Sequence, residues 1–154
     1  MLQSAYVSPL TVEDIPALEK LEEEIHLSFW GKENYRRFLE DFPEYFGSRA
    51  AIVTNSGSSK LLGFYLARSL FENLEILKVG VLAEYQRRGI GTLLMESAYA
   101  EGIKRGCRRC FLEVRKSNFV AMEFYHRHKF RVAGSRLGYY SDPVEDAWVM
   151  ERSL

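Results

Sequence analysis

The sequence predicts a mixed α/β fold, because segments with helical periodicity and strand-like segments follow one another along the whole chain. The first part indicates helices and then three consecutive strands, and the second part indicates a helix, a strand, a helix and a closing strand pair. The chain has 154 residues, 47% of them hydrophobic, and no Pro-, Gly- or Ser-rich linker interrupts it. We therefore expect a single domain over residues 1–154.

Two helices are expected before the first long strand. Thr11 and Asp14 form a T-x-x-D capping pair. Apolar residues then recur at helical spacing, namely Val12, Ile15, Leu18, Leu21 and Ile25. A second, short helix is expected around residues 35–42, ending near Pro43, which cannot continue a helix.

Three strands are expected next, over residues 49–55, 60–70 and 73–82, which are rich in β-branched, aromatic and aliphatic side chains. Residues 56–60 read SGSSK, the chemistry of a turn, and join the first two strands into a hairpin.

The second part of the chain alternates between helix and strand. A helix is expected over residues 89–106, with basic residues in its last turn and Gly106 as its carboxyl-terminal cap. A strand follows over 107–114, and then a helix over 117–129 capped by Ser117 or Asn118. Residues 130–140 and 146–154 are expected to form the closing strand pair.

Charge and hydropathy exclude several classes of partner. The chain has 21 basic and 21 acidic residues, so its overall charge favours neither nucleic acid nor an acidic membrane as a partner. The first residues lack a basic region followed by an apolar run, and no apolar run approaches the roughly 20 residues that span a bilayer. We expect a cytoplasmic protein without direct contact to membrane or nucleic acid.

Cys107 and Cys110 form a C-x-x-C pair, which could be a redox pair or half of a zinc site. A structural zinc ion needs four ligands, and His26, His126 and His128 supply no second pair at conventional spacing. We therefore expect no metal, and we interpret the cysteines as reduced, partly buried side chains. No catalytic role is expected for the histidines.

The stretch EYQRRGIGTLL, residues 84–94, predicts an anion site where a strand gives way to a helix. Unpaired N–H groups at a helix amino terminus attract anions, and Gly89 and Gly91 let the backbone approach one closely. Arg87 and Arg88 add charged donors. The stretch matches neither G-x-x-x-x-G-K-[ST] nor G-x-G-x-x-G, and a simple turn with exposed arginines is the alternative interpretation.

Three segments carry a resemblance to a known family. QRRGIG, residues 86–91, matches the Q/R-x-x-G-x-G/A signature of the GNAT superfamily of N-acetyltransferases. Residues 112–130, LEVRKSNFVAMEFYHRHKF, and residues 138–150, GYYSDPVEDAWVM, are similar to segments of its RimI group, the ribosomal-protein alanine N-acetyltransferases. The chain departs from that group at Phe29 and Gly31, and Lys78 stands where the group often has asparagine.

The resemblance implies a GNAT fold, which is a mixed, mostly antiparallel sheet of about seven strands flanked by about four helices. A splayed strand pair in that fold holds acetyl-CoA. Backbone groups of Val79, Gly80 and Val81 would contact its pantetheine and acetyl carbonyl. Asn118 would contact it too, and the pyrophosphate would be held by Gln86, Arg87, Arg88, Gly89, Ile90, Gly91 and Thr92. Glu113 would be the general base and Tyr125 the general acid.

Periodicity supports the two catalytic candidates without the family. On a strand, Glu113 points away from Leu112 and Val114, and also away from Cys110. Asn118 and Tyr125 are about two turns apart and share one helix face. A solvated glutamate and a packed tyrosine are the alternative interpretations.

We therefore expect an N-acetyltransferase that uses acetyl-CoA, and the RimI resemblance favours a protein amino terminus as acceptor, with a ribosomal protein as one candidate. A lysine, polyamine or antibiotic amine is the alternative acceptor. Two other classes are a CoA-binding module without turnover and a nucleic-acid-binding domain that uses Arg87, Arg88, Arg108 and Arg109. The zero net charge argues against the last of these.

Overall fold

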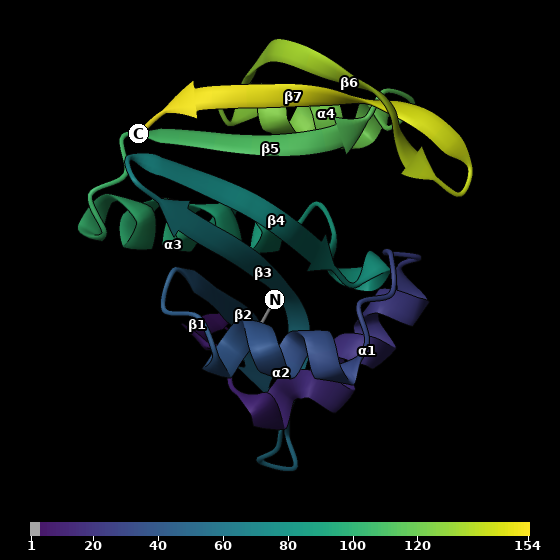
Figure 1. The fold of residues 1–154 in the computed structure, drawn as a ribbon. Helices are drawn as coiled ribbons and strands as arrows, with labels where there is room; N and C mark the ends of the chain where they lie inside the picture. The colour runs from purple at the N-terminus through teal and green to yellow at the C-terminus, as the bar shows by residue number, and fades with distance from the viewer. Residues whose placement is uncertain (1–3) are drawn as a thin grey trace.

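A computed structural model describes residues 4–154, which form a seven-stranded mixed sheet with helices on both faces (Figure 1). The strand order is β1-β2-β3-β4-β5-β7-β6. All neighbouring strands are antiparallel except β4 and β5, which are parallel and connected through helix α3. The predicted mixed and mostly antiparallel α/β fold is confirmed.

The strands are β1 (Tyr6–Pro9), β2 (Tyr45–Val53), β3 (Ser59–Leu70), β4 (Asn73–Val81), β5 (Arg109–Arg115), β6 (Arg131–Ser141) and β7 (Val144–Ser153). The helices are α1 (Ile15–Glu24), α2 (Lys32–Glu40), α3 (Ile90–Lys104) and α4 (Phe119–Arg127), with short 3-10 turns over Val12–Asp14 and Ala83–Tyr85. No helix within residues 4–154 has the length and apolar character needed to cross a bilayer.

Most of the expected elements are present, and the largest differences lie in the first part of the chain. The sequence does not predict strand β1, because its four residues, ending in a proline, are too few to show strand alternation. Strand β2 begins at Tyr45 rather than Arg49, and its early residues pair with β3. Helix α2 occupies 32–40, earlier than the expected 35–42.

The helix ends use the expected capping residues. The Thr11 backbone N–H donates to Asp14 Oδ2 over 2.9 Å, which fixes the entry to α1. Asn118 caps α4 by accepting a hydrogen bond from the Ala121 N–H over 3.1 Å. Gly106 follows the end of α3 with φ +88°, and the N–H of the next residue, Cys107, donates a hydrogen bond to the carbonyl of Gly102.

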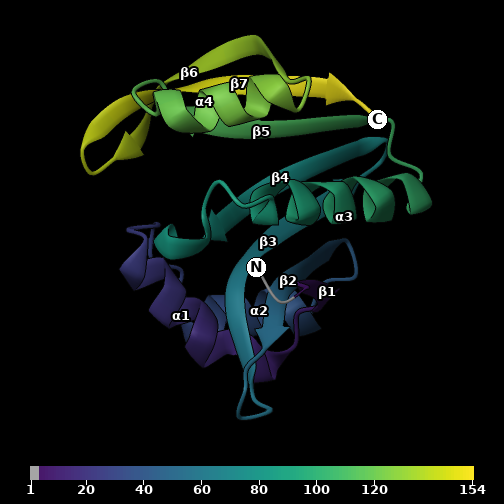
Figure 2. The same cartoon turned by 180° about the vertical axis from the view of Figure 1, so that it is seen from behind.

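Two hydrophobic cores lie on opposite faces of the sheet. Helices α3 and α4 cover one face, called here the back face (Figure 2). Its core includes Leu74, Leu94, Ala98, Leu112, Val114 and Tyr125. Helices α1 and α2 cover the front face over β3, where the core includes Leu18, Leu21, Tyr35, Phe38, Phe64 and Leu66.

A bulge at Leu77 changes which face the second half of β4 presents. Ile76 pairs with Ala67 while Lys78 pairs with Leu66, so Leu77 is the extra residue. Side chains two apart on a regular strand share one face. Because of the bulge, Ile76 instead packs in the back core, while Lys78 and Gly80 point to the front, where Ile25 and Leu27 cover Gly80.

The spacing between β3 and β4 makes a testable prediction at Gly63. A Cβ atom there would lie 2.6 Å from the carbonyl oxygen of Gly80, a backbone atom that cannot move without the strand. We expect Gly63→Ala to destabilise the fold by about 1–3 kcal/mol, the usual range for overpacking. In a thermal melt this corresponds to about 2–4 °C per kcal/mol for a chain of this size.

Gly134→Ala is the matched control, because Gly134 also lies in a strand and its Cβ would meet open space. It should leave the melting temperature unchanged or raise it slightly. Equal effects of the two substitutions would contradict the close approach of β3 and β4.

Candidate active site

The site is built where strands β4 and β5 separate. Their parallel ladder has four pairs and ends at Ile76 and Leu112. Beyond it, β4 continues to pair with β3 as far as Val81, and β5 continues to pair with β7 as far as Arg115. The facing edges of the two strands therefore diverge, and the backbone groups that β4 presents on that edge at Val79–Val81 are available to a ligand.

The back side of this opening carries the predicted anion loop. Gln86 through Gly89 follow the end of β4 and lead into α3, and all four are exposed. Arg87 has φ +59° and Gly89 has φ +84°, both left-handed, while Ile90 begins the right-handed helix. Alternation of this kind turns successive N–H groups to one side and makes a concave anion site.

The amino terminus of α3 adds to that site. Gly89 is the N-cap residue and has no side chain that could satisfy the first N–H groups of the helix. A Cβ at Gly91 would lie 3.2 Å from the ring of Phe124 on α4, so the small residue allows the two helices to approach here. The Arg88 guanidinium lies over the Tyr85 ring at 5.7 Å. The loop therefore suits a phosphate or pyrophosphate group.

Three of the residues predicted to bind the cofactor form side-chain hydrogen bonds within the protein. The Gln86 side chain donates to the carbonyl of Val81 over 3.0 Å, which fixes the loop against the end of β4. The Thr92 hydroxyl lies 3.1 Å from Nε2 of His128. The Asn118 side-chain oxygen caps α4. The first contact joins the loop before α3 to β4, the second joins α3 to the end of α4, and the third lies within α4.

Glu113 lies on the front face of β5, as the strand alternation predicted. Its Oε1 accepts a hydrogen bond of 2.6 Å from Nε of Arg136 on β6. The contact crosses β7, which lies between β5 and β6. The β7 residue that pairs with Arg136 is Ala147, whose side chain is small. The Glu113 carboxylate also raises the pKa of the neighbouring Tyr139 to about 12, because a hydrogen bond to the phenol and the negative charge both disfavour phenolate.

Tyr125 lies on the opposite side, within the back core. Burial, with smaller effects from Tyr140 and Cys110, raises the pKa of its phenol well above the ordinary value. The phenol therefore stays protonated throughout the neutral range. Glu113 and Tyr125 therefore lie on opposite faces of the sheet.

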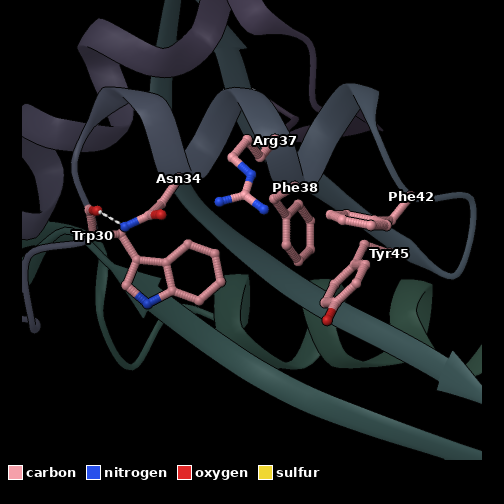
Figure 3. A pocket seen from close by; sticks show the side chains of 6 residues that line it. All are labelled: Trp30, Asn34, Arg37, Phe38, Phe42 and Tyr45. Atoms are coloured by element: carbon pink, nitrogen blue, oxygen red, sulfur yellow. Dashed lines mark hydrogen bonds between the residues drawn. The ribbon is translucent and has the colours of Figure 1, made fainter.

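The front side of the opening is bordered by residues 25–31, called here the entrance loop. This segment connects α1 to α2, and its Ile25 and Leu27 cover β4 at Gly80. Trp30, near the end of the loop, lines a hollow of about 330 Å³ along α2 together with Asn34, Arg37, Phe38, Phe42 and Tyr45 (Figure 3). Phe29 projects into solvent with 73% exposure.

The turn between β6 and β7 borders the opening on the side of β5. Arg115 donates to the carbonyl oxygens of Asp142 and Pro143 and pairs with Glu145 at 3.3 Å. Glu145 also accepts hydrogen bonds from the backbone N–H and the hydroxyl of Ser117, which lower its pKa. These contacts fix the turn to the segment that joins β5 to α4.

The cysteines are placed away from this chemistry. Cys107 and Cys110 are both free and buried. Cys110 faces the back core, opposite to Glu113, and burial raises the pKa of its thiol to about 12. Within residues 4–154 no group of His, Cys, Asp and Glu side chains could hold a metal ion.

The four arginines of the nucleic-acid hypothesis do not form one surface. Arg87 and Arg88 follow the carboxyl end of β4. The backbone N–H groups of Arg108 and Arg109 bind the carbonyl of Glu72, just before the other end of β4. The two pairs of arginines therefore lie at opposite ends of β4.

Sequence reasoning missed the partners of Glu113 and of Lys78. Arg136 and Tyr139 contact Glu113 from a strand two places away in the sheet, and only the order β5-β7-β6 reveals that proximity. Lys78 forms a buried ion pair with Glu22 on α1. An apparently surface-type lysine inside an apolar strand, LEILKVGV, was the available signal.

Comparisons with known proteins agree with this geometry. A ribosomal protein bS18 alanine N-acetyltransferase of Escherichia coli is 30% identical over 146 residues, covering 94% of each chain. An N-alpha-acetyltransferase of Saccharolobus solfataricus is 33% identical over 135 residues, covering 78% of this chain and 77% of that protein. The crystal structure of the Escherichia coli ribosomal-protein-S18-alanine N-acetyltransferase superposes with a TM-score of 0.82 at 27% identity, covering 97% of this chain and 94% of that one. The family model of the acetyltransferase (GNAT) family matches residues 15–130, and this chain belongs to that family of acetyltransferases.

Proposed function

We propose that this protein transfers the acetyl group of acetyl-CoA to the α-amino group of a protein amino terminus, with a ribosomal protein as the candidate acceptor. One observation carries the proposal. The separated strands β4 and β5 have an anion loop on the back face and the Glu113 carboxylate on the front face. The similarity to amino-terminal acetyltransferases supports the choice of acceptor.

The donor fits the back side of the opening. Backbone N–H groups from Gln86 to Gly91, the amino terminus of α3 and the two exposed arginines suit the pyrophosphate of CoA. The thioester end would then lie along Val79, Gly80 and Val81, whose free edge can donate N–H groups to the acetyl carbonyl oxygen. Thr92 and Asn118 complete the proposed donor site, and within the protein they contact His128 and cap α4.

The acceptor then enters from the front, because the donor occupies the back. A free α-amino group has a pKa near 7.7–8.0, whereas a lysine amine lies near 10.4. A large share of the α-amine is therefore neutral at cellular pH, and a carboxylate base suffices. Glu113 takes a proton from the amine as the amine attacks, directly or through a water molecule.

Tyr125 serves the departing sulfur on the other face. Its buried phenol remains protonated and can give its proton to the thiolate of CoA as the carbon–sulfur bond breaks. The base and the acid thus act on the two sides of the transferred acetyl group. We propose the cytoplasm as the site of action, where free thiols such as those of Cys107 and Cys110 persist.

An acceptor panel tests the proposed function. The protein is incubated with acetyl-CoA and with free amino-terminal peptides, amino-blocked lysine peptides and polyamines, and products are detected by mass spectrometry. We expect acetylation of peptide α-amines only. Acetylation of lysines or polyamines would refute the proposed acceptor, and no acetylation at all would favour a CoA-binding module.

The anion loop makes a prediction about the donor. Arg87→Gln and Arg88→Gln should each weaken acetyl-CoA binding about tenfold or more, because a hydrogen bond to a charged group contributes about 1.5–3 kcal/mol. Isothermal titration calorimetry measures the dissociation constant. Arg108→Gln, at the other end of β4, should leave it unchanged. Equal weakening by all three substitutions would point to nonspecific charge attraction instead.

The catalytic assignments predict losses in kcat. Glu113→Gln and Tyr125→Phe should each lower kcat by about 100-fold or more, the usual contribution of a positioned base or acid. The dissociation constant of acetyl-CoA should change little, because each substitution removes one proton-transfer group while keeping the shape of the side chain.

Matched controls exist for both catalytic residues. Glu151→Gln removes another carboxylate that pairs across strands with an arginine, Arg131, at 3.0 Å. Tyr99→Phe removes another buried phenol whose pKa is raised by burial. Both should retain kcat, and wild-type turnover of Glu113→Gln and Tyr125→Phe across pH would show the assignments to be wrong.

A further inference from the structure

The front face contains a fully buried ion pair that the proposed chemistry does not use. Lys78 Nζ lies 3.2 Å from Glu22 Oε1, and the two side chains are 4% and 1% exposed. Every other ion pair within residues 4–154 is markedly more exposed. Burial removes water from the Lys78 ammonium and lowers its pKa, although the nearby Glu22 carboxylate opposes this shift.

A buried ion pair is a poor means of adding stability. The energy needed to remove both charges from water rivals their attraction, and apolar side chains of similar volume often serve the fold equally well. The retention of this pair beside a functional opening therefore calls for another explanation, and the remaining hydrogen bonds of the pair supply one.

Both charged groups hold the backbone of the entrance loop. Lys78 Nζ donates to the carbonyl oxygen of Ser28 over 2.5 Å. The backbone N–H of Trp30 donates to Glu22 Oε2 over 3.0 Å. The ammonium on β4 thus holds the loop at Ser28, and the carboxylate on α1 holds it at Trp30. The ammonium can only donate hydrogen bonds and the carboxylate can only accept them, so neither group could replace the other.

Trp30 is held on its other sides as well. Its carbonyl accepts a hydrogen bond of 2.6 Å from the Asn34 side chain, which Figure 3 draws. Its ring lies 5.6 Å from the rings of Tyr35 and Phe38, and Lys78 Nζ lies 5.2 Å from it. The Lys78 ammonium therefore contacts the loop through both its backbone and its aromatic side chain.

The two halves of the loop are held in different ways. It lies between α1 and α2, and His26 and Gly31 near its ends have φ of +56° and +81°. His26 adopts the left-handed conformation that ends α1, and the N–H of Leu27 donates to the carbonyl of Glu22 over 3.0 Å. Beyond Leu27, the backbone of Ser28 and Trp30 is held by the side chains of Lys78, Glu22 and Asn34.

We propose that Lys78 and Glu22 are positioning residues, which hold the entrance loop as the front wall of the opening and so set the affinity for the acceptor. Lys78 directly precedes Val79–Val81 on β4, the residues proposed to bind the acetyl group. Its hydrogen bond to Ser28 therefore fixes the position of the entrance loop relative to that part of β4. The anion loop lies on the back face and makes no use of this pair. The inference rests on the proposed function insofar as the acceptor enters from the front.

Two double variants test the proposal. Glu22→Met with Lys78→Met removes both charges while keeping side-chain volume, so that no buried charge is left unpaired. Glu22→Lys with Lys78→Glu keeps an ion pair with exchanged signs, but an ammonium cannot accept from the Trp30 N–H and a carboxylate cannot donate to the Ser28 carbonyl.

We expect both double variants to raise KM for the acceptor peptide at least tenfold, while the dissociation constant of acetyl-CoA stays within twofold of wild type. Amide exchange of a peptide covering residues 26–32 should become at least tenfold faster. A purely structural role would instead be rescued by the double methionine variant. Arg68→Met with Glu75→Met is the matched control, since this more exposed pair joins β3 and β4 on the same face, and it should change neither quantity.

The amide-exchange measurement separates this proposal from the proposed function. Faster exchange of residues 26–32 with unchanged acetyl-CoA binding supports the positioning role even if the panel shows that the acceptor is not an α-amine, and KM is then measured for the amine that is acetylated. Wild-type exchange in the double methionine variant would overturn the proposal. An equal loss of donor and acceptor affinity would overturn it as well.

Discussion

The structure depends on one short parallel ladder. Strands β4 and β5 are linked through α3, and their four pairs from Asn73 to Ile76 hold the two halves of the sheet together. Leu74 and Cys110 are completely buried in this ladder and pack against the helices of the back face. Beyond Ile76, β4 pairs only with β3, and β5 pairs only with β7. The opening between β4 and β5 therefore results from the strand pairing itself.

The bulge at Leu77 determines what the two sides of the opening contain. If Leu77 were a regular strand residue instead of a bulge, Lys78 would face the same side as Ile76 and would meet the apolar back core. With the bulge, Lys78 and Gly80 face α1 and the entrance loop, and Val79 and Val81 pack against the back core. The bulge therefore determines which side chains of β4 face each side of the opening.

Local sequence patterns predicted most elements, because capping residues and periodicity act over a few residues. Asn118 caps α4 and Gly106 ends α3 as expected, and the face of Glu113 followed from strand alternation. The partners of Glu113 and Lys78 could not be predicted in the same way. Arg136 reaches Glu113 over 23 positions of sequence, and Glu22 lies 56 positions before Lys78, so only the completed sheet brings each pair together.

The placement of the thiols argues for direct transfer from donor to amine. An acyl-cysteine intermediate would need a thiolate at the opening, with a base to activate it and a path for the amine. Cys110 is completely buried on the back face, and its pKa of about 12 leaves almost none of it ionised at neutral pH. Glu113 points to the opposite face of β5 and cannot take its proton. In the proposed function, the Glu113 carboxylate serves the arriving amine and the protonated Tyr125 phenol serves the leaving thiolate, so no enzyme-bound acetyl group is needed between them.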